Sequence, residues 1–181
     1  MNKKWLVIIG VVVVLAIIGA VVSGSKDKTP EPTQLQSPTQ TKAEESTTEA
    51  PIDVASLDEL YNGMLKATKG KEPNTSAMVD AIATYAKKAA KQGNEDVGNE
   101  AALYIANNYP DFFSSNTQME KIMLCGYYLE YLDHSDRVTQ LGQDVEQAVK
   151  YVYRGAEDVS SNATQENLDQ IGEILEESGL K

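Results

Sequence analysis

The sequence predicts an all-α protein with an N-terminal transmembrane helix, a disordered linker and a compact bundle of five or six antiparallel helices. Three observations lead to this fold class. An uninterrupted apolar stretch begins at Leu6 and ends at Val22. A polar stretch rich in Thr, Pro and Glu follows it, and from Ile52 onward apolar residues recur with helical spacing. No segment alternates apolar and polar residues for long enough to indicate a strand.

The apolar stretch has the length of a membrane anchor. It carries no charged or polar side chain and would extend over about 26 Å as a helix. Trp5 before it and Ser23-Gly24 after it bring the segment close to the thickness of a bilayer's hydrocarbon core. We therefore expect residues 5–24 to form a single-pass anchor. The alternative is a signal peptide cleaved near Val22, which would make the protein secreted.

The charges around this stretch predict its orientation. Lys3 and Lys4 lie in residues 1–4, whereas Lys26 and Lys28 on the other side flank an acid, Asp27. The positive-inside rule then keeps residues 1–4 in the cytoplasm and places the rest of the chain outside the membrane. This order of segments is typical of envelope proteins of Gram-positive bacteria.

Residues 25–51 have the composition of a flexible spacer. They hold four of the six prolines and a single large aliphatic residue, Leu35. Such a segment buries too little apolar surface to offset the entropy of ordering, so we expect it to be disordered. A flexible chain of this length spans roughly 30 Å.

Residues 52–181 are expected to form one extracytoplasmic domain, and this domain is acidic. It contains 11 Lys and Arg against 22 Asp and Glu, in a chain of net charge −11. We expect such a surface to repel nucleic acid, anionic lipid and anionic wall polymers. Cys125 is the only cysteine, so no intrachain disulfide is possible.

The first three helices are predicted over residues 53–69, 76–92 and 94–109. Ser56 and Glu59 form a capping box at the start of the first helix. Gly70 and Gly93 are expected to end the first two helices, and Tyr109-Pro110 to end the third.

The next helix, over residues 119–132, is predicted to be the central one because it is apolar around most of its circumference. A capping box that starts at Thr117 precedes it. Two more helices are expected over residues 136–158 and 164–178, and Gly155 either ends or kinks the former.

His134 is the only histidine, so any histidine-dependent chemistry must use it. Glu130 lies four residues before His134, and the pair makes a weak candidate for a metal site with Asp133 or Asp136 as further ligands. No catalytic motif is present, and we expect no cofactor. Cys125 lies in the most apolar helix, as expected for an inert buried thiol.

Tyrosine is unusually frequent in two consecutive helices. Neighbouring residues on a helix point about 100° apart, so we expect Tyr127 and Tyr128 not to face the core together. Exposed tyrosines suit a groove for a protein, a peptide or a glycan. The candidate ligand-binding residues are Tyr127, Tyr128, Tyr131, Tyr151 and Tyr153.

These observations favour a membrane-anchored, extracytoplasmic interaction module without catalytic activity, bound to the membrane through Leu6 to Val22. Two alternatives stay open. One is an envelope enzyme that uses carboxylates or a metal. The other is a structural or immunity-type protein that acts on another membrane protein.

Overall fold

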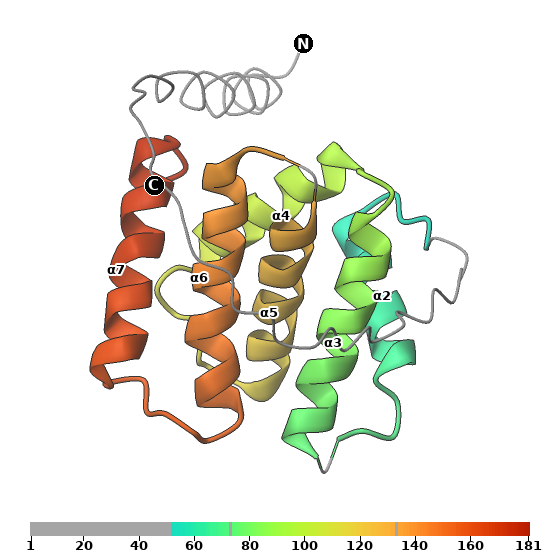
Figure 1. The fold of residues 1–181 in the computed structure, drawn as a ribbon, viewed down its shortest axis with the longest axis horizontal. Helices are drawn as coiled ribbons and strands as arrows, with labels where there is room; N and C mark the ends of the chain where they lie inside the picture. The colour runs from blue at the N-terminus through green and yellow to red at the C-terminus, as the bar shows by residue number, and fades with distance from the viewer. Residues whose placement is uncertain (1–51, 73, 133) are drawn as a thin grey trace, which may run out of the picture.

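The computed structural model describes residues 52–72, 74–132 and 134–181, and these form six α-helices and no strand (Figure 1). In chain order the helices are α2 (Leu57–Ala67), α3 (Thr75–Ala90), α4 (Glu95–Asn108), α5 (Asn116–Tyr131), α6 (Asp136–Tyr153) and α7 (Asn162–Glu177). The predicted all-α class is confirmed for this part of the chain. The expected anchor (5–24) and linker (25–51) lie outside the described residues. None of the six helices combines the length and apolarity needed to cross a bilayer.

Side-chain caps fix where most of these helices begin. At α2 the Ser56 hydroxyl accepts a hydrogen bond from the Glu59 amide at 3.2 Å, and the Glu59 carboxylate accepts one from the Ala55 amide at 2.9 Å. The predicted capping box is therefore present. At α5 the prediction was wrong: Ser115 caps the helix by accepting from the Gln118 amide at 3.1 Å. Thr117 lies inside α5, because Ser115 satisfies the free amides one turn earlier.

Glycines follow the ends of four helices, and three of them were expected there from the sequence. Gly70, Gly93, Gly155 and Gly179 all have positive φ values, between 66° and 82°. Gly155 settles the alternative left open for the fifth predicted helix, because α6 ends at Tyr153 and does not continue to residue 158. The helix ends instead of kinking.

Helix α5 is the centre of the bundle. It packs against α3, α4 and α6, so little of its circumference is left for solvent. The four consecutive residues from Ile122 to Cys125 have no exposed surface. Tyr127 and Tyr128 are 7% and 0% exposed, so the expectation that they could not both face the interior was wrong. A helix enclosed by three neighbours buries side chains that point in different directions.

Helices α5 and α6 approach each other through two glycines. A Cβ on Gly142 would lie 2.6 Å from the Gly126 carbonyl oxygen, and a Cβ on Gly126 would lie 2.9 Å from the Glu146 amide nitrogen. These neighbours are backbone atoms, which cannot rotate away. Only glycine at both positions allows the two main chains to touch.

Helices α7, α2 and α3 pack at the two sides of the pair formed by α5 and α6. Figure 1 shows α7 on one side, beyond α6, and α2 and α3 on the other. Helix α7 is held by Tyr109, whose hydroxyl donates to the Leu168 carbonyl at 3.1 Å and lies against Gly172. On the other side the Tyr85 hydroxyl of α3 lies against Gly63 of α2. Tyrosine-on-glycine contacts thus attach an outer helix at each side.

Replacing Gly142 by alanine should destabilise the domain. In an unconstrained helix this change gains about 1 kcal/mol of helix propensity. Here the methyl group meets the backbone of α5, and we expect a net loss of about 1–3 kcal/mol. Urea unfolding followed by circular dichroism measures it. The exposed Gln147 on the same helix provides the control, because Gln147→Ala should change stability by less than about 0.5 kcal/mol. An alanine at 142 that stabilises the protein would contradict the close contact.

Candidate functional site

The structure does not gather the five candidate tyrosines on one surface. Tyr127, Tyr128 and Tyr153 are buried, whereas Tyr131 and Tyr151 are 36% and 39% exposed. Tyr131 ends α5 and Tyr151 lies in the last turn of α6. Because α5 and α6 are antiparallel, the two exposed rings lie at opposite ends of the pair. A ligand-binding role for these residues stays a prediction.

The buried tyrosine hydroxyls have partners inside the protein. The Tyr128 hydroxyl donates to the Asn94 carbonyl at 3.1 Å, which ties α5 to the start of α4. The Tyr153 hydroxyl donates to the Glu120 carboxylate at 2.7 Å and joins the end of α6 to the first part of α5. Burial raises the pKa of Tyr128 to about 12. These two phenols therefore stay protonated at neutral pH and connect helices.

A group of charged side chains lies beside the contact between α5 and α6. Glu146 is only 4% exposed, and its Oε1 atom accepts from the Lys150 ammonium at 2.8 Å. Burial, followed by the charge of Glu146, raises the pKa of both Tyr127 and Glu130. A carboxyl with a raised pKa beside a second carboxylate is the usual arrangement for acid–base catalysis. In this protein the second carboxylate, Glu146, is buried and already paired with Lys150.

The two candidate metal ligands, Glu130 and His134, have different neighbours in the structure. The Nδ1 atom of His134 accepts a hydrogen bond from the Ser135 amide at 2.9 Å. Burial and then the charge of Glu146 raise the pKa of Glu130, while the charges of Lys150 and Lys87 act in the opposite direction. Within the described residues no three His, Cys, Asp or Glu side chains are placed to hold a metal ion. Asp133, named above as a further ligand, lies outside the described residues.

Cys125 is fully buried, and this burial raises the pKa of its thiol to about 12. A thiol with such a pKa is protonated at neutral pH and is a poor nucleophile. This agrees with the expectation of an inert cysteine.

Two surface hollows were missed by the sequence analysis. The larger is a groove between α2 and α3 of about 530 Å³, with Lys71 and Lys88 among its lining residues. The smaller, about 410 Å³, lies where α2, α4 and α5 meet. In it the Lys121 ammonium lies 4.5 Å from the ring centre of Tyr104, 5.0 Å from that of Tyr61 and 3.8 Å from an Asp58 oxygen. Lys121 is therefore already engaged by the protein's own side chains.

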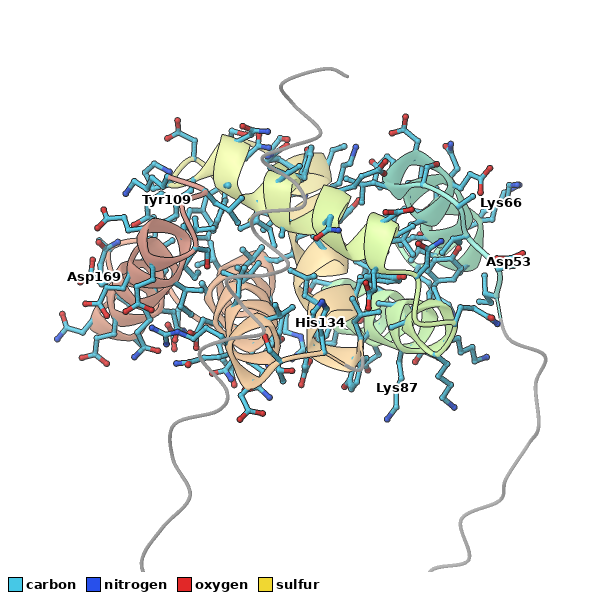
Figure 2. All side chains as sticks on the ribbon, turned by 90° about the horizontal axis from the view of Figure 1, so that it is seen from above. Asp53, Lys66, Lys87, Tyr109, His134 and Asp169 are labelled. Carbon is cyan, nitrogen blue, oxygen red and sulfur yellow. The ribbon has the colours of Figure 1, made fainter. Side chains whose placement is uncertain are left out.

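Charge is divided unevenly between the two sides of the bundle. Residues 52–91, which include α2 and α3, contain six lysines and five acids. Residues 92–181 contain five basic residues and 17 acids. Figure 2 shows Lys66 and Lys87 on the side of α2 and α3, and Asp169 on the opposite side, on α7. The excess of negative charge thus belongs to residues 92–181, and residues 52–91 are close to neutral.

Comparison with protein-family models, with curated proteins and with solved structures finds no match for this chain.

The raised pKa of Glu130 predicts how stability changes with pH. The folded state binds this proton more tightly than the unfolded state does, so its contribution is present below the ordinary pKa of 4.5 and is lost as pH rises through the raised value. We expect Glu130→Gln to raise the melting temperature at pH 7 and to have little effect below about pH 4. Thermal unfolding between these pH values measures the difference.

Two further residues sharpen this test. Glu173→Gln, on the exposed face of α7, makes the same charge change and controls for net charge. Burial also raises the pKa of Asp144, so some loss of stability with rising pH should persist in the Glu130 variant. A Glu130→Gln protein that is less stable than the wild type at pH 7, by an amount independent of pH, would contradict the assignment.

Proposed function

We propose that this protein is a membrane-anchored, extracytoplasmic helical module that acts by binding and not by catalysis. The observation that carries the proposal is the order of three segments in the sequence. A basic start precedes a charge-free apolar stretch from Leu6 to Val22, a polar spacer of low hydrophobicity follows, and the acidic helical domain comes last. A protein, a peptide or a glycan outside the membrane is the expected partner.

The chemistry of the domain supports binding over catalysis. Cysteine, histidine and glutamate often serve as nucleophiles or general bases. The residues of these types described above are either buried or already hydrogen-bonded within the protein. Cys125 is buried and protonated, the Nδ1 atom of His134 accepts from a backbone amide, and Glu146 is paired with Lys150. The surface hollows, by contrast, are open to solvent and lined by mixed polar and apolar residues.

A topology experiment tests the location. Fusion of alkaline phosphatase after Lys181 should give active enzyme in a bacterial host, because this enzyme folds only outside the cytoplasm. Fusion of green fluorescent protein at the same position should give little fluorescence. The opposite pair of results would contradict the proposed orientation. Lys3→Glu/Lys4→Glu should reduce export if these lysines set the orientation.

The enzyme alternative makes a separate prediction about metal. A carboxylate and histidine site at Glu130 and His134 requires that Zn²⁺ or Mn²⁺ raise the melting temperature of the wild-type protein and not that of His134→Ala. We expect no metal-dependent shift in either protein. Thermal unfolding with and without added metal, after treatment with a chelator, measures this. A shift lost in His134→Ala but kept in Glu173→Gln, an exposed position on α7, would favour the enzyme.

A further inference from the structure

The smaller surface hollow, of about 410 Å³, lies between the start of α2 and one face of α4. The N-cap and first turn of α2 form one wall. Lys121 of α5 lies between the two helices. The α4 residues have the spacing of a single helix face, and they are Glu100, Leu103, Tyr104 and Asn107.

Two hydrogen bonds hold the start of α2 against α4. The Leu57 amide donates to the Glu100 carboxylate at 2.6 Å, and the Asn94 side-chain amide donates to the Val54 carbonyl at 2.9 Å. These bonds bring together two segments that are more than 30 residues apart in the sequence. As a result Asp58 and Glu100 line the same hollow.

Both segments carry negative charge only. Residues 52–65 contain three acids and no Lys or Arg, and residues 92–120 contain five acids and no Lys or Arg. All of these acids except Glu120 are exposed. The surface that α2 and α4 form together is therefore acidic, and it attracts cations from solution.

The lining of the hollow has the same sign. Among the described residues that line it, Asp58 and Glu100 are negative and Lys121 is the one cation. Lys66 and Lys91, which border the two acidic segments along the chain, do not line it. The hollow thus keeps a net negative charge with Lys121 included.

Lys121 shows that a cation is stabilised at this place. Its ammonium lies 4.5 Å from the ring centre of Tyr104, 5.0 Å from that of Tyr61 and 3.8 Å from an Asp58 oxygen. Two aromatic rings and a carboxylate around an ammonium are the groups that offset the cost of removing a cation from water. The Lys121 side chain is 19% exposed, whereas that of Asp58 is 89% exposed, so a second cation can reach the carboxylate from solvent.

We propose that this hollow receives an arginine side chain from a basic peptide segment of a protein partner. A guanidinium pairs with a carboxylate through two hydrogen bonds and stacks on aromatic rings. A carboxylate has about four lone-pair positions, so Glu100 can accept from a guanidinium while it accepts from the Leu57 amide. Leu103 offers an apolar contact to the arginine stem. This inference rests on the proposed binding function and specifies the class of partner.

Peptide binding to the full chain, kept in solution by an uncharged detergent, tests the proposal. The probe is a short labelled peptide in which two arginines flank a leucine, and the matched control peptide carries neutral citrulline at both arginine positions. Fluorescence anisotropy gives the Kd of each peptide. We expect the arginine peptide to bind at least about tenfold more tightly at low salt, because each exposed ion pair contributes up to about fivefold. Salt at about 1 M should abolish the difference.

Matched variants locate the binding site. Asp58→Asn/Glu100→Gln should weaken binding of the arginine peptide roughly tenfold, and glutamine at position 100 can still accept from the Leu57 amide. Asp169→Asn/Glu173→Gln removes the same charge from exposed positions on α7 and should change the Kd by less than about twofold. Circular dichroism confirms that each variant keeps its helices.

A second variant leaves the cap of α2 unchanged. Asn107 is exposed at the rim of the hollow, and Asn107→Lys should weaken binding of the arginine peptide about threefold through repulsion. Gln170→Lys, at an exposed position on α7, adds the same charge away from the hollow and should have little effect.

The outcomes separate this site from the binding function as a whole. Equal weakening by the α4 and α7 variants would mean that the peptide responds to net charge, and would overturn the site. Equal affinities for the arginine and citrulline peptides, or no binding of either, would overturn the recognition of arginine. None of these results would alter the location of the domain, which the fusions after Lys181 test independently.

Discussion

The contact between Gly126 and Gly142 is the constraint on which the rest of the bundle depends. Both helices carry the same pattern, a glycine followed four residues later by a glutamate, with Glu130 on α5 and Glu146 on α6. Because the helices are antiparallel, each glycine faces the backbone of the other helix at its glutamate. Two main chains that touch leave no room for solvent one turn further along. The same close approach therefore encloses Glu146 and requires Lys150 beside it.

The central position of α5 explains why the domain uses tyrosine in its interior. Neighbours on three sides enclose almost the whole helix, including positions whose side chains reach polar ends of other helices. A phenylalanine at position 128 of α5 would fill the space but leave the Asn94 carbonyl without its donor, and one at position 153 of α6 would do the same to the Glu120 carboxylate. Tyrosine supplies apolar bulk and a donor together. The frequency of tyrosine thus reflects how the helices are joined, at least for Tyr128 and Tyr153.

Much of the fold could be predicted from the sequence, because helical periodicity and caps are local signals. Each helix in the described part was expected, and four of the glycines that follow helix ends mark turns of positive φ. The start of α5 was misplaced because Ser115 and Thr117 both suit a cap, and only backbone geometry chooses between them. The role of Gly126 and Gly142 was missed, although a glycine in the middle of a helix costs about 1 kcal/mol and so signals a close contact. Which helix provides that contact is not a local property.

The candidate surface was less predictable, since it depends on which helices become neighbours. A net charge is a sum over the sequence, and it discards the order in which charges occur. The lysines between positions 66 and 91 are visible in the sequence, but their meaning depends on α2 and α3 forming one side of the bundle and α7 the other. The groove likewise needs Ala67 of α2 to lie near Ala77 and Ala81 of α3. Because screening in salt limits electrostatic interactions to about 8 Å, a partner responds to the edge that it touches and not to the sum. The charge that a partner meets therefore depends on the arrangement of the helices and not on the composition alone.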